Sequence, residues 1–269
     1  MTTFDAASYW EDRLTRNPGV RGIGHTDLGT QYNRWLYRVR RRVFFRTIRS
    51  LRRSTSMNWS SARVLDIGSG TGFYVQLWKE AGVQSITASD LTNIAIRRLR
   101  EALPGQKALR LDIGETLPIE QLGQYQAISA FDVFFHIVDD TRYERAIQNV
   151  SSLLAPGGLF LFSDLFLHGE TLRVEHMVCR PLEEVTRILR RAGFEILRRI
   201  PMFVIMAQPL DTRSVMGRFL WRLMTYPIKK SEAAGFVAGG LLSAVEVGLT
   251  RFVSESPTTE IMVCRKVIS

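Results

Sequence analysis

The stretch VLDIGSGTG, Val64 to Gly72, decides the fold. An apolar run with an acid near its end is followed by Gly68, Gly70 and Gly72, which indicates a strand that turns sharply into a helix. Glycines let a ligand approach the main chain, and the first turn of a helix offers free N–H groups. A dinucleotide site would need the spacing G-x-G-x-x-G, but position 73 is Phe73. The stretch therefore predicts a ligand-binding loop of another kind after the first strand of an α/β domain.

Strand-like and helix-like stretches alternate from Arg63 onward, which is typical of an α/β domain with a parallel sheet. The predicted strands are Arg63–Ile67, Ser85–Ser89, Leu109–Asp112, Ala127–Val133, Gly158–Ser163, Glu195–Ile205 and Glu260–Val267. The predicted helices among them are Tyr74–Ala81, Asn93–Leu103, Thr141–Leu154 and Leu182–Ala192. At 269 residues the chain is long enough for one such domain with additions.

Two helical segments fall outside this alternation. The predicted division is a helical N-terminal cap (1–58), a Rossmann-like core (59–207), a helical insertion (208–257) and a final strand (258–269). The predicted helices of the two additions are Phe4–Arg16 and Gln31–Arg53 in the cap, and Arg213–Met224 and Glu232–Phe252 in the insertion. Both additions should lie over the C-terminal edge of the sheet, where lids select substrates. The apolar run Ala233–Leu249 is short for a membrane span and contains Glu246, so a buried or lid helix is expected.

Composition excludes several classes of protein. Hydrophobic residues make up 45% of the chain and charged residues 23%, which rules out a largely disordered chain and a polytopic membrane protein. The two cysteines, Cys179 and Cys264, form no cluster with histidines, so they give no metal-site signal and fit a reducing compartment. The first residues carry no basic and apolar signal pattern. We therefore expect a cytoplasmic protein.

The net charge of +10 has a local origin. Ten arginines and no acidic residue fall between Leu28 and Leu65, and the rest of the chain is close to neutral. The helix over Arg34–Arg53 combines these arginines with an apolar stripe. Three interpretations stay open: a solvated face, a site for an anionic acceptor, or a patch for a membrane surface, which would place the protein at the inner face of a membrane.

Five motifs in this order resemble those of class I S-adenosylmethionine-dependent methyltransferases, over about Ser60–Ile205 and the final strand. They are the glycine loop, Asp90 after the second predicted strand, Asp112-Ile113 after the third, AISAFDVFFHIVDD around the end of the fourth, and LLAPGGLFLFSD entering the fifth. The resemblance implies a Rossmann-like, seven-stranded, mostly parallel sheet with helices on both faces and an antiparallel last strand. It also implies S-adenosylmethionine as cofactor, S-adenosylhomocysteine as product, and no metal.

The resemblance also implies which residues bind the cofactor. By this resemblance, the methionine part is bound by Asp66, Gly68, Ser69, Gly70 and Gly72, and the ribose by Asp90. The adenine is bound by Leu91, Asp112 and Ile113, and Phe131 lies near the methyl group. Each of these residues also has a structural interpretation. Asp90, for example, could cap the helix that begins after Thr92, and Asp139 and Asp140 are expected to cap the helix that follows them.

The acceptor side is indicated more weakly. His136 follows the fourth predicted strand and is the candidate general base, because an imidazole can accept a proton near neutral pH. The further candidates for acceptor binding are Tyr9, Trp10, Tyr32, His176 and Arg180. For the aromatic residues, packing between helices is the alternative interpretation.

These features predict methyl transfer to a hydroxyl or amine of a small molecule, with carbon or carboxylate as less favoured acceptors. The alternatives are a peripheral-membrane enzyme that acts on a lipid, glycolipid or other anionic amphiphile, and a cofactor-binding module without activity. Nucleic-acid methylation is disfavoured, because the fourth predicted strand lacks a (D/N/S)-P-P-aromatic loop and neither cysteine follows a proline.

Overall fold

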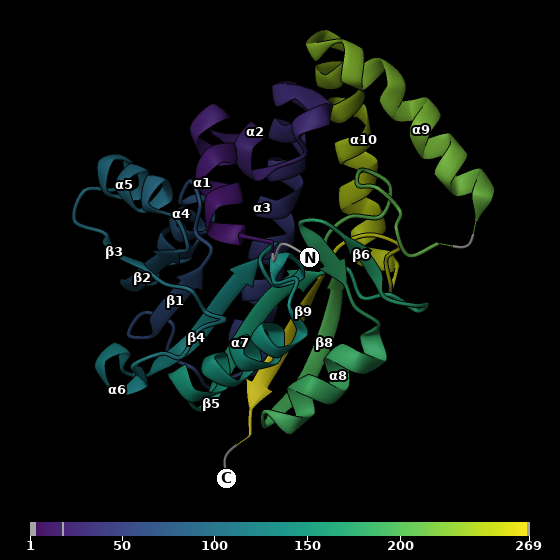
Figure 1. The fold of residues 1–269 in the computed structure, drawn as a ribbon. Coiled ribbons are helices and arrows are strands. Elements are labelled where there is room, and N and C mark those ends of the chain that lie inside the picture. The colour runs from purple at the N-terminus through teal and green to yellow at the C-terminus, as the bar shows by residue number, and fades with distance from the viewer. Residues whose placement is uncertain (1–3, 18, 213, 268–269) are drawn as a thin grey trace.

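The predicted first strand lies in the middle of a seven-stranded sheet (Figure 1). The computed structural model describes residues 4–17, 19–212 and 214–267. The strands are β1 (Arg63–Ile67), β2 (Ser85–Asp90), β3 (Lys107–Arg110), β4 (Tyr125–Phe131), β5 (Leu154–Asp164), β6 (Leu172–Val174), β7 (Met177–Cys179), β8 (Phe194–Pro201) and β9 (Glu260–Lys266). The α-helices are α1 (Ala6–Arg16), α2 (Val20–Ile23), α3 (Gly29–Ser54), α4 (Phe73–Glu80), α5 (Asn93–Ala102), α6 (Ile119–Leu122), α7 (Asp140–Leu153), α8 (Leu182–Arg191), α9 (Val215–Lys230) and α10 (Glu232–Phe252). Two 3₁₀ turns, η1 (Thr26–Leu28) and η2 (Phe134–His136), complete the described elements.

The sheet confirms the predicted fold class. Its strand order is β3-β2-β1-β4-β5-β9-β8. The pairs of β1 with β2 and β4, of β2 with β3 and of β4 with β5 are parallel, whereas β9 is antiparallel to both β5 and β8. The carboxyl ends of the parallel strands therefore meet at one edge, the position where open α/β sheets bind their ligands.

Helices cover both faces of the sheet because the strand residues alternate between two cores. In β5, Leu159 and Leu161 join the core beneath α3, α4 and α5, whereas Phe160 and Phe162 join the core beneath α7 and α8. Strands buried on both faces are expected where helices cover both sides of a parallel sheet. This arrangement leaves the carboxyl edge free to carry the loops of a site.

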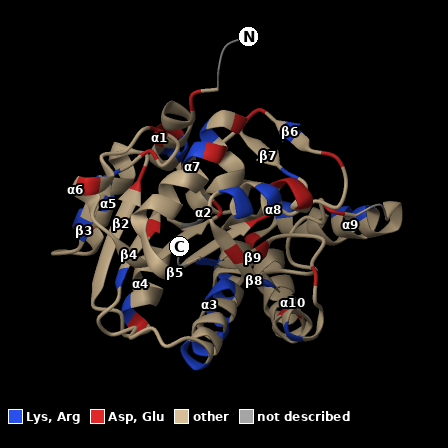
Figure 2. Ribbon diagram, turned by 90° about the horizontal axis from the view of Figure 1, so that it is seen from below, with Lys and Arg blue, Asp and Glu red and all other residues tan. Residues whose placement is uncertain are grey.

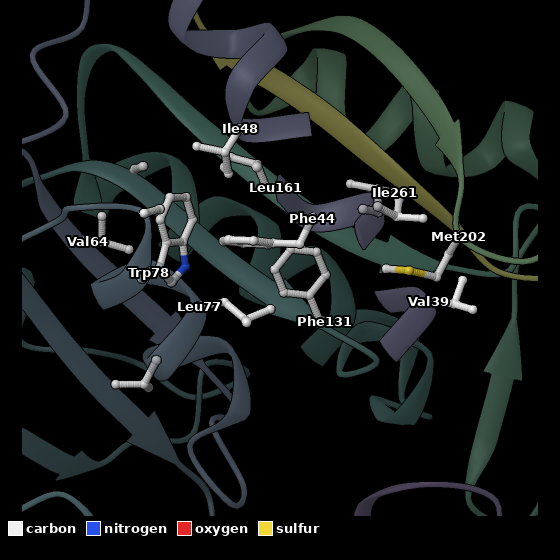
Figure 3. Packing of buried hydrophobic residues seen from close by; sticks show 14 of the residues in the cluster. Val39, Phe44, Ile48, Val64, Leu77, Trp78, Phe131, Leu161, Met202 and Ile261 are labelled. Atoms are coloured by element: carbon white, nitrogen blue, oxygen red, sulfur yellow. The ribbon is translucent and has the colours of Figure 1, made fainter. Parts of the chain in front are cut away.

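Helix α3 belongs to the first of these cores, which corrects its prediction as part of a cap. Phe44 packs edge-on against Trp78 of α4 and lies 6.0 Å from Phe131 of β4, measured between ring centroids (Figure 3). Val39, Ile48 and other apolar residues at helical spacing are buried in the same cluster. The apolar stripe of α3 therefore faces the sheet, and most of its arginines lie on the outer side (Figure 2).

The insertion differs from its prediction in bounds and in burial. Helix α9 continues through Pro227 to Lys230 instead of ending at Met224, and the predicted first residue, Arg213, lies outside the described residues. Helix α10 has 21 residues, and by length and composition it could cross a membrane. Only 28% of its most apolar stretch is buried, which rules out the first of the two expected alternatives, a buried helix or a lid helix.

Contacts along one side of α10 show why it is part of the fold. The carboxylate of Glu232 accepts hydrogen bonds from the main-chain N–H groups of Thr30 and Gln31 at the start of α3, at 2.8 and 2.7 Å. A Cβ atom on Gly239 would lie 2.5 Å from the ring of Trp35, so the two helices approach closely there. Helix α10 therefore runs beside α3 and beyond the carboxyl edge of the sheet (Figure 1).

Several predicted strands end early: β4 ends at Phe131 instead of Val133 and β9 one residue early at Lys266, and β3 and β8 end early for reasons that the structure shows. Strand β3 ends at Arg110, because the Asp112 carboxylate accepts a hydrogen bond from the Gly114 N–H group and closes a turn there. Strand β8 ends at Pro201, and the next residues turn back so that the Met202 N–H group bonds to the Thr259 carbonyl. The short β6–β7 hairpin was not predicted, since its three-residue strands are too short to show a pattern.

Candidate functional site

The glycine loop after β1 has a backbone that favours glycine. Gly68, Gly70 and Gly72 have φ angles of 67°, 51° and 82°, in the left-handed region that other residues rarely adopt. A Cβ atom on Gly68 would also lie 2.4 Å from the Val133 side chain, which lies two residues after the end of β4. The loop is thus fitted closely against the neighbouring strand end and presents main-chain atoms to the space above the sheet.

Asp90 at the end of β2 ties this loop in place. One of its carboxylate oxygens accepts a hydrogen bond from the Gly70 N–H group at 3.0 Å, and the other accepts from the N–H and hydroxyl groups of Thr92. Thr92, not Asp90, is the N-cap of α5, so the capping interpretation of Asp90 is wrong. Burial raises the pKa of the Asp90 carboxyl, while the hydrogen bonds that it accepts favour its charged form.

A pocket of about 880 Å³ opens at this edge of the sheet. Its volume lies at the upper end of the range for small-molecule sites, roughly 300–1,000 Å³. The predicted site residues that line it are Trp10, Gly68, Ser69, Gly70, Asp90, Leu91, Asp112, Ile113, Phe131 and His136. Residues of α1 line the pocket as well, so this part of the predicted cap lies where it was expected. None of the described residues of the insertion 208–257 lines the pocket, so this part of the chain is not a lid over it.

Asp112 lies in the pocket wall within an ion pair. Its carboxylate lies 2.6 Å from the Arg142 guanidinium of α7 and accepts the Gly114 N–H bond. The predicted helix cap at Asp139 is confirmed, because its side chain accepts a hydrogen bond from the Arg142 N–H group. Asp140 instead binds Arg180 and Arg173 through its carboxylate.

Two of the predicted cofactor residues do not line the pocket. Asp66 is buried inside the sheet, where it accepts a hydrogen bond of 2.5 Å from the Ser129 hydroxyl, and its burial raises its pKa to about 7. Gly72 is the N-cap of α4, and a Cβ atom there would meet Leu99 and Leu103 at 3.0 Å. Both residues support the loop from below instead of facing a ligand.

His136 lies in the pocket wall, and one of its two ring nitrogens is already engaged in a hydrogen bond. Its Nδ1 atom lies 2.8 Å from the carbonyl oxygen of His176. Because a carbonyl oxygen can only accept a hydrogen bond, Nδ1 carries the proton and donates the hydrogen bond. Burial lowers the pKa of His136 to about 4, which keeps the imidazole neutral at physiological pH. Within the described residues, Nε2 has no hydrogen-bond partner, and it is the nitrogen with a free lone pair.

The other acceptor candidates lie behind the wall or far from it. The rings of Tyr9 and His176 stack at 5.2 Å, and His176 also stacks on His136 at 5.9 Å. Tyr32 is buried against α10 and the turn after β8, where its hydroxyl donates to the Met206 carbonyl. Arg180 is buried with its guanidinium on the Tyr143 ring and the Asp140 carboxylate. Tyr32 and Arg180 are therefore structural residues, and their predicted acceptor role is wrong.

The sequence analysis missed an ion pair that has one of its two partners in the pocket wall. Asp132, next to Phe131, lines the pocket, and its carboxylate lies 2.6 Å from the guanidinium of Arg40. Arg40 belongs to α3 and is only 6% exposed. Asp132 has a φ angle of 58°, and its main-chain N–H and carboxylate both bond to the Ser163 hydroxyl. The sequence does indicate that Arg40 faces inward, because Arg40 lies four residues from both Leu36 and Phe44 on the apolar stripe.

Comparison with protein families supports one assignment. A family model described as a methyltransferase domain matches residues 35–199. The ubiquinone biosynthesis O-methyltransferase of Xanthomonas euvesicatoria pv. vesicatoria is 34% identical over 115 residues, which are 42% of this chain and 46% of that protein. The match thus spans less than half of the length of this curated relative.

Solved structures agree with the fold. The CcbJ methyltransferase from Streptomyces caelestis superposes with a TM-score of 0.58 at 15% identity, over 98% of this chain and all of that one. Magnesium protoporphyrin IX methyltransferase from Synechocystis, solved with bound S-adenosylhomocysteine, gives a TM-score of 0.56 at 14% identity, with 97% of each chain covered. At these identities the likeness concerns the fold alone.

Proposed function

Since the chain belongs to the methyltransferase domain family and is an S-adenosylmethionine-dependent methyltransferase, we propose that it methylates a hydroxyl group of a small molecule, with an amine as the alternative acceptor. The observation that carries the proposal is the pocket at the carboxyl edge, where the glycine loop, Asp90 and His136 line one space. The name of the curated relative, an O-methyltransferase, favours oxygen as the acceptor atom.

The residues at the loop end of the pocket fit the cofactor. Gly68 and Gly70 line the pocket with main-chain atoms alone, and Val133 occupies the place where a side chain on Gly68 would lie. Asp90 is held rigidly by the loop and by Thr92, so its carboxylate can accept hydrogen bonds from ribose hydroxyls without reorganising. Leu91 and Ile113 provide apolar contacts for a flat ring. S-adenosylmethionine supplies, when bound, a methyl group on a positively charged sulfur.

His136 is the proposed general base. Its Nδ1–H bond to the His176 carbonyl fixes the ring and its tautomer, so Nε2 is the atom that takes the proton from an acceptor hydroxyl. The lowered pKa keeps this nitrogen unprotonated over the physiological range. Trp10 of α1 packs edge-on against the His136 ring, with ring centroids 4.7 Å apart, and helps to exclude water. Alignment of two bound reactants contributes roughly 7–11 kcal/mol to such transfers, so positioning carries most of the catalysis.

A lipid or another anionic amphiphile is the second candidate acceptor. The observation that favours it is the apolar surface of α9 and α10, on which Leu223 and Leu241 are 62% and 71% exposed. Such a surface could bring the pocket close to an amphiphile in a membrane. For either acceptor we propose a cytoplasmic enzyme, which fits the two buried free cysteines.

The test is methyl transfer from labelled S-adenosylmethionine to a panel of small phenols, aliphatic alcohols and amines, and to their long-chain forms. We expect label on a hydroxyl, and His136→Gln to lower kcat by about 10²–10⁴-fold, the usual contribution of a general base. His168→Gln is the matched control, because His168 is exposed and pairs with Asp211 outside the pocket. Transfer to amines alone would contradict the proposed acceptor atom, and full activity of His136→Gln would contradict the base.

A further inference from the structure

Helix α9 turns an apolar stripe toward solvent. Val215, Phe219 and Leu223 are 71%, 58% and 62% exposed, and their spacing of four residues places them on one side of the helix. On its inner side α9 buries only Thr225 and Ile228 among the described residues. Figure 1 shows α9 standing away from the sheet. Exposed apolar surface of this extent marks an interaction site.

Helix α10 extends this surface. Val237, Leu241 and Val245 are 59%, 71% and 54% exposed and again follow one another at every fourth residue. The two acids of α10 are both hydrogen-bonded to other parts of the fold: Glu232, which is exposed, accepts bonds from the start of α3, and Glu246 is buried and accepts a hydrogen bond of 3.0 Å from the Ile205 N–H group. Helix α9 has no acidic residue at all. The exposed side of the α9–α10 hairpin thus carries apolar groups without a free carboxylate.

Basic residues border the apolar surface. Arg218 and Arg222 are exposed and lie one turn apart along one flank of the α9 stripe. Next to α10, the guanidinium of Arg38 lies over the Trp35 ring at 4.2 Å, and that ring lies 5.8 Å from the ring of exposed Phe236. Figure 2 shows the basic residues of α3, in blue, on the side away from the sheet. An apolar stripe with a basic border is the pattern of a helix that lies in a membrane interface.

We propose that the exposed side of the α9–α10 hairpin docks on an anionic lipid bilayer. The apolar stripe would enter the boundary between headgroups and acyl chains, and the arginines would contact anionic headgroups. A second copy of the chain fits this surface less well. A two-fold interface would bring the same arginine border of both copies together, in a protein whose net charge is already +10.

The hairpin lies on the bilayer and does not cross it. If α10 left the fold to span a membrane, Glu232 would lose its bonds to Thr30 and Gln31, and the carboxylate of Glu246 would enter hydrocarbon. Helix α3 separates the docking surface from the pocket, because Trp35 packs on α10 whereas Tyr37 lines the pocket wall. Docking is therefore independent of the proposed acceptor and can be measured without activity.

The test is co-sedimentation of the full chain with vesicles of phosphatidylglycerol and phosphatidylcholine, and with phosphatidylcholine vesicles alone. We expect binding to the anionic vesicles that weakens as salt shortens the Debye length from about 10 Å at 0.1 M. Arg218→Gln with Arg222→Gln should weaken binding about 25-fold, since each basic residue near an anionic surface contributes about fivefold. Phe219→Asp with Leu223→Asp should abolish it.

The matched control is Arg187→Gln with Arg191→Gln, an exposed pair of the same spacing on α8, on the opposite face of the sheet. We expect this control to bind vesicles like the wild type, and all variants to keep the circular dichroism and melting temperature of the wild type. A wild type that ignores anionic vesicles at low salt would overturn the proposal. The proposal would also be overturned if the wild type formed a homodimer, did not bind vesicles, and became monomeric on Phe219→Asp. That result would assign the surface to a second copy of the chain.

Discussion

Helices α3 and α9 are built from similar residues and are used in opposite ways. Both combine arginines with an apolar stripe, and both lie outside the strand–helix alternation of the sequence. In α3 the stripe faces the sheet, so Phe44 is fully buried and most of the arginines are outside. In α9 the stripe faces solvent, and Phe219 is 58% exposed. Amphipathic character shows that a helix will face something apolar, but not whether that partner lies within the chain.

The largest expected effect compares the same substitution in the two helices. Phe44→Ala should lower the free energy of unfolding by about 3–5 kcal/mol, because it opens a cavity between Trp78 and Phe131. Phe219→Ala should change it by less than about 0.5 kcal/mol, as surface substitutions do. Urea denaturation of the two variants measures both values. Equal losses would show that α9 is packed in solution and would remove the contrast.

The same limit explains how far the sequence predicted the structure. The glycine loop, the alternation of elements and the acids at strand ends predicted the sheet, its order of elements and the pocket edge, because each depends on local geometry. The burial of α3 could not be read from its stripe, since a stripe facing a sheet and one facing solvent have the same period.

Site residues could be predicted from the sequence only where their role depends on a position directly at the end of a strand. Gly68 and Asp90 follow directly from strand ends, and the structure places both in the pocket. Arg180 was assigned to the acceptor because it follows the fifth strand, yet its guanidinium is buried on the Tyr143 ring and paired with Asp140. The pair of Asp132 with Arg40 joins residues 92 positions apart, and only the packing of α3 on the sheet brings them together.

The next prediction compares an inward with an outward arginine of α3. Asp132→Asn removes the carboxylate that compensates buried Arg40, and Asn tolerates the left-handed backbone at this position. We expect a loss of about 3 kcal/mol in the free energy of unfolding, as for other broken buried pairs. Glu80→Gln is the control, because Glu80 pairs with Arg41 on the surface, where a loss of at most about 1 kcal/mol is expected. Urea denaturation measures both, and equal effects would mean that Arg40 is hydrated.

A smaller effect on stability is expected from Gly→Ala substitutions in α10, with opposite signs on the two sides of the helix. Gly239→Ala should destabilise the fold by about 1–3 kcal/mol, because its Cβ atom would lie 2.5 Å from the Trp35 ring. Gly248→Ala meets no atom within 4 Å and should stabilise the helix by roughly 0.5–1 kcal/mol. Melting temperatures that shift in opposite directions would confirm that α10 packs on α3 along one side only. A Gly239→Ala variant as stable as the wild type would show that the two helices separate easily.

The smallest effect concerns the link between the sheet and the insertion. His168, after β5, lies 2.6 Å from the Asp211 carboxylate and 3.3 Å from that of Glu255, and both acids belong to the insertion. The hydrogen bond with Asp211 raises the pKa of His168 above its ordinary 6.5, whereas burial lowers that of His136 in the pocket to about 4. The two histidines should therefore give stability opposite dependences on pH.

The folded state binds the His168 proton more tightly than the unfolded state, so its stabilisation is complete below pH 6.5 and is lost as pH rises through the raised pKa. For His136 the unfolded state binds the proton more tightly, so stability falls as pH drops from 6.5 toward 4. Titration of both rings by NMR measures the two pKa values. Asp211→Asn should lower that of His168 toward 6.5 and leave that of His136 unchanged, because no described residue of the insertion lines the pocket. A shift of both histidines in this variant would mean that the insertion and the pocket are coupled, and that the boundary drawn between them at α3 is wrong.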